Sequence, residues 1–277
     1  MIEITQEQLE SARYELKAAP TDAWRKHDEH KPIPGYFEFD WLSARHPDLY
    51  HKFALSSVGL MDELDKLVDL TGLEVIDIGA GTGRTTMGVA KKAKKVTAVD
   101  AFPSVLFFGR ALAHQAGFEN VNYLRGDSAN LPLPDNSFDA SICAWAIINH
   151  PEAYRVLKPN GYLIDLIPAP GALCGELTPV LADVYPEIIT EVAPVDQLNA
   201  TCPDSDFVIQ ENTWNGVPVM APIRVHDFTY TADYVDYLEA AAIIGRLYGP
   251  KAKRYMLDGQ KSTLSWRLRI VVNCVKK

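Results

Sequence analysis

Short apolar runs separated by helix-compatible stretches dominate the middle of this chain. Residues 75–78 form one such run, glycines follow at positions 79, 81 and 83, and the next residues are compatible with a helix. Further apolar runs follow at residues 95–100, 121–124, 140–147 and 161–164. Strands that alternate with helices in this way predict an α/β fold built around a parallel sheet.

The two flanks of this region have different patterns. Residues 1–60 predict helices that are interrupted by prolines, and we expect an N-terminal helical cover there. Residues 61–277 are expected to form the main domain, with a possible cap from about 211 to 262. Within this C-terminal part, the pattern predicts a strand at 207–210, a helix at 232–248 and a long last strand at 264–275.

The glycines at 79, 81 and 83 predict a tight loop between a strand and a helix. A glycine has no Cβ, so its backbone can turn sharply and approach a ligand closely. The spacing G-x-G-x-G differs from the G-x-G-x-x-G of dinucleotide-binding proteins, and no Gly-Lys-Ser or Gly-Lys-Thr follows. A ligand with a carboxylate and no phosphate therefore suits this loop better than a nucleotide polyphosphate.

Acidic residues follow two of the later strands. Asp100 ends the run 95–100, and Asp127 follows the run 121–124. A carboxylate at the end of the second strand can accept hydrogen bonds from ribose hydroxyls. Together with the segments 131–139 and 155–164, these blocks resemble, in order, the class I S-adenosylmethionine (SAM)-dependent methyltransferases, specifically the small-molecule, methyltransferase type 11-like group.

This resemblance implies a Rossmann-like, seven-stranded, doubly wound sheet with an antiparallel last strand, and SAM as the cofactor. It implies that the glycine loop surrounds the methionine part, that Asp100 binds the ribose and that Asp127 binds the adenine amino group. Phe102 is expected either to pack on the adenine or to be a core aromatic residue. The cofactor site implied in this way comprises Asp77, Gly79, Ala80, Gly81, Gly83, Asp100, Ala101, Phe102, Asp127, Ser128, Ala144 and Trp145.

His150 is the best candidate for a catalytic base. It follows the fourth predicted strand, whose carboxyl end faces the ligand crevice in this architecture. The alternative is a histidine at a helix start, where Pro151 fixes the turn. His226 and Tyr36 are weaker candidates, each with an alternative role as a polar rim residue. The short link between His150 and residue 155 either widens one wall of the acceptor pocket or leaves that wall to another segment.

Two segments are candidates for that role. Residues 36–42 combine aromatic residues with carboxylates and are either a lid over the cofactor or a packing segment. In the C-terminal half, the expected acceptor wall consists of Trp214, Met220, Phe228, Tyr230 and Tyr234, with packing against the sheet as the alternative.

Composition narrows the class of partner. The formal net charge is −9, which disfavours tight binding to nucleic acid, and no apolar run approaches the roughly 20 residues of a membrane span. The four cysteines are widely spaced and predict no metal site. We expect a cytoplasmic protein that acts on a small-molecule acceptor, and the sequence does not predict its oligomeric state.

Methyl transfer to a small molecule is therefore the leading function. A non-catalytic SAM-binding or partner-activating subunit is the alternative. An arsenite-type methyltransferase, with Cys174 and Cys202 as soft ligands, is a minor alternative. The glycine spacing disfavours a Rossmann dehydrogenase.

Overall fold

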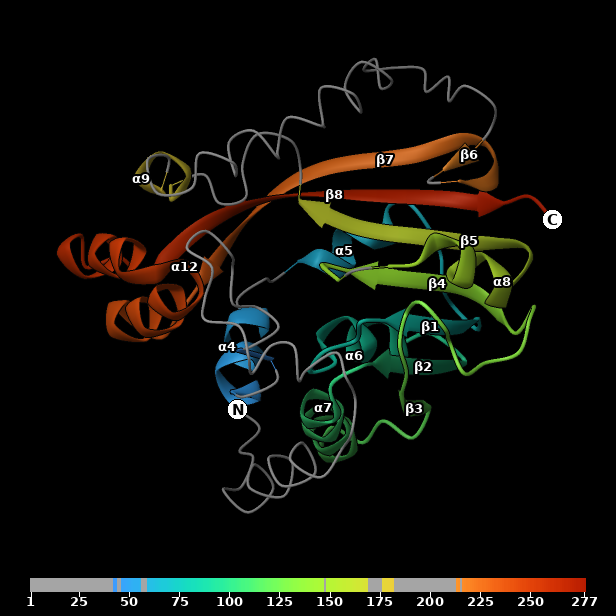
Figure 1. Ribbon diagram of the computed structural model, residues 1–277, viewed down its shortest axis with the longest axis horizontal. Coiled ribbons are helices and arrows are strands. Elements are labelled where there is room, and N and C mark those ends of the chain that lie inside the picture. Colours follow the sequence, from blue (N-terminus) through green and yellow to red (C-terminus); the bar gives the residue numbers. More distant parts are fainter. Residues whose placement is uncertain are drawn as a thin grey trace.

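A computed structural model of the protein is shown in Figure 1. The structure describes residues 42–43, 46–55, 59–146, 148–168, 176–181, 213–214 and 216–277. Most of the N-terminal cover, including the segment 36–41 and Tyr36, lies outside the described residues, as do the predicted strand at 207–210 and the cysteines at 174 and 202.

An eight-stranded sheet forms the centre of the protein, with the strand order β3-β2-β1-β4-β5-β8-β7-β6. The strands β3, β2, β1, β4 and β5 are parallel, whereas β8 pairs antiparallel with β5 and β7 pairs antiparallel with β8. The fold class expected from the sequence is confirmed, including the antiparallel last strand, but the sheet has eight strands instead of seven, because the two-residue β6 pairs with β7 at its edge. The strands are β1 (Glu74–Ile78), β2 (Lys95–Asp100), β3 (Val121–Arg125), β4 (Phe138–Ala144), β5 (Leu157–Pro168), β6 (Thr213–Trp214), β7 (Val217–Asp233) and β8 (Thr263–Val275).

Helices cover the sheet on both faces, because successive strand residues point to opposite sides. Val75 belongs to the hydrophobic cluster on one face, while Ile76 and Ile78 belong to the cluster on the other. Figure 1 shows α4 and α12 on the side toward which the carboxyl ends of β4 and β5 point. The helices are α4 (Pro47–Leu55), α5 (Leu60–Asp65), α6 (Arg84–Ala90), α7 (Pro103–Gln115), α8 (His150–Val156), α9 (Thr178–Leu181) and α12 (Tyr237–Asp258).

Of the element boundaries that differ from the sequence prediction, two have a clear physical cause. The fourth strand was expected to extend to residue 147 but ends at Ala144, because Trp145 adopts a left-handed backbone with φ of 58°. The last long helix was expected from residue 232 but begins at Tyr237. Residues up to Asp233 extend β7 instead, and the Asp236 carboxylate then caps the helix by accepting from the backbone N–H groups of Leu238 and Glu239.

The region expected as a possible cap contains β7 and α12. β7 is a 17-residue strand that pairs with β8 from Val219 to Asp233, so this part of the region extends the main sheet. α12 is kinked at Gly249, where φ is 85° and Pro250 follows.

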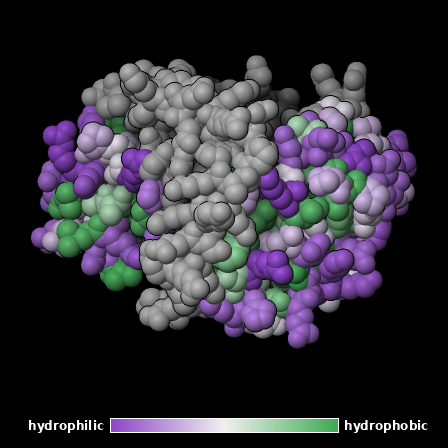
Figure 2. All heavy atoms as spheres, turned by 60° about the horizontal axis from the view of Figure 1, so that its bottom comes forward, coloured by the Kyte–Doolittle hydropathy of each residue, from purple (hydrophilic) through white to green (hydrophobic). Residues whose placement is uncertain are grey.

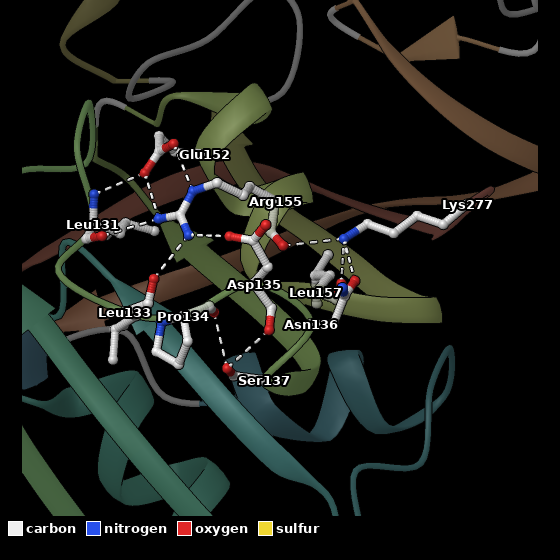
Figure 3. Close-up of polar contacts among 10 residues, drawn as sticks. All are labelled: Leu131, Leu133, Pro134, Asp135, Asn136, Ser137, Glu152, Arg155, Leu157 and Lys277. Atoms are coloured by element: carbon white, nitrogen blue, oxygen red, sulfur yellow. Dashed lines mark hydrogen bonds and ion pairs between the residues drawn. The ribbon is translucent and has the colours of Figure 1, made fainter.

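The link between β4 and β5 is short, as the sequence indicated, and a polar network around Arg155 fixes it (Figure 3). The Arg155 guanidinium donates to the carboxylates of Glu152 and Asp135 and to the carbonyls of Leu131 and Leu133. The hydrogen bonds that Arg155 donates to Glu152 and Asp135 raise the pKa of Arg155. The network holds α8, and therefore His150 at its start, against the loop that precedes β4.

The described surface in Figure 2 is mostly hydrophilic, with hydrophobic residues scattered among the polar ones. Among the described residues, Val235 and Leu238 are the large hydrophobic side chains that are exposed. None of the described helices is both long and apolar enough to cross a membrane.

Candidate functional site

The glycine loop lies between β1 and α6 and is built from left-handed backbone. Gly79, Gly81 and Gly83 have φ of 72°, 55° and 84°. The N–H groups of Gly79 and Ala80 donate to the carbonyl of Val99 at 2.8 and 3.0 Å, which fastens the loop to β2. A Cβ on Gly79 would lie 2.2 Å from the Cβ of Ala146, so this position requires glycine for space as well as for conformation.

Asp100 stands at the end of β2 and is joined to the loop. Its Oδ2 accepts from the Gly81 N–H at 2.8 Å, and its Oδ1 accepts from the Phe102 N–H at 2.9 Å. The side chain is almost buried, with 9% of its surface exposed. These bonds orient a carboxylate beside the glycine loop, and Ala101 and Phe102 continue from it into α7.

Asp77 lies within β1 and points into the protein. It is 1% exposed, and its Oδ2 accepts from the Thr86 hydroxyl on α6 at 2.6 Å. Burial raises the pKa of Asp77 to about 6, the Thr86 hydrogen bond opposes this rise, and the nearby Asp100 adds to it. Asp77 therefore joins β1 to the helix that follows the glycine loop. A change at Asp77 would affect cofactor binding by moving this loop.

Asp127 follows β3 at the same edge of the sheet. Asp127 is exposed. Its Oδ1 accepts a hydrogen bond from the Ala129 N–H at 2.9 Å, and this bond stabilises the turn that contains Ser128. Asp100 pairs with Arg125, the last residue of β3, so Asp100 ends β2 and Asp127 follows the end of the neighbouring strand.

The end of β4 supplies the opposite wall. The Trp145 N–H donates to the carbonyl of Leu166 at 3.0 Å, and the chain then turns so that Ala146 contacts Gly79. The cofactor contacts expected of Ala144 and Trp145 stay predictions, and Ala146 is an additional residue that contacts the loop. No sequence signal marks a contact between residues 67 positions apart.

Two residues of α4 reach the glycine loop and were missed by sequence reasoning. A Cβ on Gly81 would lie 3.0 Å from the Tyr50 ring, and His51 Nδ1 is 3.0 Å from the Thr82 hydroxyl oxygen. Burial, and secondarily the charge of Arg84, lowers the pKa of His51 to about 4, so its imidazole is neutral at neutral pH. The sequence predicted helices in this region, but it did not predict that Tyr50 and His51 contact the glycine loop.

His150 begins α8, as the alternative interpretation expected, with Asn149 as its N-cap and Pro151 in the first turn. It also makes a specific polar contact: its Nε2 is 2.9 Å from Oδ2 of Asp165 on β5. Both side chains are largely buried, at 13% and 4% exposed. The structure therefore places a histidine–carboxylate pair near the carboxyl ends of β4 and β5.

These residues converge on one edge of the sheet. The sheet order reverses between β1 and β4, and ligands of open α/β sheets bind in the crevice at such a point. The glycine loop and Asp100 fit SAM, because close backbone can surround its methionine part and an oriented carboxylate can accept from its ribose. The fold and this edge of the sheet are typical of α/β proteins that bind a nucleoside cofactor.

Comparison with known proteins supports the resemblance to methyltransferases. Residues 76–165 match the family described as "Methyltransferase domain". This part of the chain is therefore similar to SAM-dependent methyltransferase domains, and the match supports SAM as the cofactor.

Demethylmenaquinone methyltransferase of Tropheryma whipplei strain Twist is 37% identical over 107 residues, which cover 36% of this chain and 44% of that protein. The Staphylococcus aureus demethylmenaquinone methyltransferase is 30% identical over 155 residues, which cover 52% and 61%. The chain thus spans about half the length of these relatives. The crystal structure of YcgJ protein from Bacillus subtilis has 18% identity and a TM-score of 0.47, covering 78% of this chain and 98% of that chain.

Several other residues that the sequence analysis named as site candidates join elements of the fold or pack in its core. His226 pairs with Glu63 at 2.7 Å and joins β7 to α5. Tyr230 and Tyr234 are buried in the main hydrophobic cluster, and Phe228 packs against it. Among the described residues, no group of three or more His, Cys, Asp or Glu side chains could hold a metal ion.

Proposed function

We propose that this protein transfers a methyl group from SAM to a small-molecule acceptor. The observation that carries the proposal is the Asp100 carboxylate, which the Gly81 and Phe102 N–H groups orient beside the glycine loop. When bound, SAM supplies an electrophilic methyl group on its sulfonium. Gly79, Ala80, Gly81 and Gly83 would surround its methionine part, Asp100 would accept from the ribose hydroxyls, and Asp127 with Ser128 would contact the adenine.

His150 is proposed as the base that prepares the acceptor. Asp165 at Nε2 fixes the tautomer and orientation of the ring, and a carboxylate partner stabilises the imidazolium that forms when the ring takes a proton. Nδ1 is then the nitrogen through which His150 would exchange a proton with the acceptor. A base of this kind is needed for a carbon or hydroxyl acceptor that must lose a proton.

A hydroquinone-type ring is the acceptor class that we propose. The support is the naming of the Tropheryma and Staphylococcus relatives as demethylmenaquinone methyltransferases. We further propose that the protein works in the cytoplasm. The alternative of a non-catalytic SAM-binding subunit would keep the cofactor residues and have no use for an acceptor base, so the His150–Asp165 pair favours an enzyme.

Transfer of a labelled methyl group tests the proposal. The protein is incubated with SAM that carries a trideuterated methyl group and with reduced naphthoquinones that have an unsubstituted ring carbon. Mass spectrometry is expected to show a product heavier by one deuterated methyl group, together with S-adenosylhomocysteine. SAM binding without product on hydroquinones, phenols or amines would favour the non-catalytic subunit instead.

A further inference from the structure

Two tryptophans meet beside the cofactor loop. Trp145 follows β4 and Trp266 lies on β8, and their ring centroids are 5.4 Å apart at an interplanar angle of 61°. Trp266 is completely buried and Trp145 is partly exposed. The buried nitrogen Nε1 of each indole has no hydrogen-bond partner within the part of the chain that the structure describes.

A buried N–H group without an acceptor is costly, and folded proteins pair nearly all such groups. Two of them within one ring cluster require a local explanation. The rings around them are aromatic: Phe53 contacts both indoles edge-on, with centroids 6.2 and 5.6 Å away, and Tyr248 of α12 lies 6.1 Å from Trp266. A ligand oxygen that accepts from the indole N–H groups would complete this site.

The location of the cluster fits a methyl acceptor. Trp145 is followed directly by Ala146, which contacts Gly79, and Phe53 neighbours Tyr50, which lies over Gly81. The rings therefore begin at the glycine loop, where the methionine part of the cofactor is proposed to lie. Trp145 keeps this position through a left-handed backbone, a conformation that is uncommon in residues other than glycine and that recurs at functional sites.

We infer that Trp145 and Trp266 form the acceptor-recognition site for a flat aromatic ring that carries a hydroxyl or carbonyl oxygen. The ring would pack against the indole and Phe53 faces, and its oxygen would accept from the indole N–H groups. The partly exposed Trp145 marks the side from which such a ring would enter. This inference rests on the proposed function, because it assigns the ring to the methyl acceptor.

The indole N–H groups give a direct readout in nuclear magnetic resonance. The protein is labelled with ¹⁵N-tryptophan and saturated with S-adenosylhomocysteine, and the variants Trp145→Phe and Trp266→Phe assign the two signals. Addition of 1-naphthol is expected to move these two N–H signals downfield, as a new hydrogen bond does. Naphthalene, which has the ring and lacks the oxygen, is expected to leave them without a downfield shift.

Calorimetry with the same variants measures the contribution to affinity. Each Trp→Phe change keeps an aromatic ring and removes one N–H, so naphthol affinity should fall roughly 3- to 10-fold, the range for one neutral hydrogen bond. Affinity for S-adenosylhomocysteine should stay within about two-fold, because the contact expected of Trp145 with the cofactor is made by its backbone, which the substitution keeps, and Trp266 lies on β8. Tyr154→Phe is the control, since its hydroxyl donates to the Lys276 carbonyl at 2.8 Å and its ring packs against the hydrophobic cluster on the other face of the sheet from Trp266.

The outcomes separate this inference from the proposed function. Cofactor binding with naphthol-induced shifts at both indoles supports the inference. Cofactor binding with unmoved indole signals, or equal shifts from naphthol and naphthalene, overturns it and leaves the methyltransferase proposal standing. Failure of the wild-type protein to bind S-adenosylhomocysteine would contradict the proposed function itself.

Discussion

Replacing His150 by glutamine is expected to reduce methyl transfer by roughly 10²- to 10⁴-fold, the usual contribution of a positioned general base. Glutamine can still hydrogen bond to Asp165, so α8 and its Asn149 cap should stay in place. SAM affinity should remain unchanged, because His150 lies on α8 and not in the glycine loop. Turnover and SAM binding are measured on the same preparations.

The chain offers a matched control for this change. His226 also pairs with a carboxylate, that of Glu63, but it joins β7 to α5. His226→Gln should therefore leave turnover near the wild-type value. Asp165→Asn should lower turnover while retaining SAM binding, because the ring would lose the partner that fixes its tautomer. Full turnover in His150→Gln would remove this residue from the chemistry and return it to a helix-start role.

Asp77→Asn is expected to stabilise the protein at pH 8 by about 1–3 kcal/mol. Burial raises the pKa of Asp77 from 3.8 to about 6, so the folded state favours the protonated form. The resulting cost to stability is absent below pH 3.8, grows as the pH rises and is complete above about pH 6, where it reaches roughly 3 kcal/mol. Asparagine removes this cost and keeps an oxygen for the Thr86 hydroxyl.

Chemical denaturation at pH 5 and pH 8 measures the effect, and the gain should be smaller at pH 5. Asp139→Asn provides a control of opposite sign. Burial acts to raise the pKa of Asp139, but hydrogen bonds from Lys158 and the Glu74 N–H outweigh burial and lower it. That variant should lose stability at pH 8. A gain for Asp77→Asn that does not depend on pH, or a loss at pH 8, would contradict the assignment.

The sequence predicted those parts of the site that depend on local pattern. The glycines at 79, 81 and 83 and the carboxylate at 100 follow from residue type and spacing, and the structure places them together. Each strand of the parallel half was likewise predicted, because a buried strand is a short apolar run.

The parts that were not predicted depend on contacts between distant segments. Ala146 against Gly79, and Tyr50 over Gly81, join residues from different elements, and no spacing rule marks such pairs. The partner of His150 is Asp165, 15 residues away on the neighbouring strand, and it becomes visible only when the register of β4 and β5 is known. The early end of β4 at Ala144 also escaped prediction, because an apolar run does not reveal the left-handed backbone of Trp145.

Calorimetric titration with SAM tests the central claim most directly, using the wild-type protein, Asp100→Ala and Asp100→Asn. Wild-type protein is expected to bind SAM and not NAD. Asp100→Ala should weaken SAM binding by about 1–3 kcal/mol, the range for losing hydrogen bonds to a charged group. Asp100→Asn keeps one acceptor oxygen, so its SAM affinity should lie between those of the wild type and Asp100→Ala. This intermediate value separates loss of the ligand contact from a change in the conformation of the loop. Unchanged SAM affinity in folded Asp100→Ala protein, or no SAM binding by the wild type, would contradict the account.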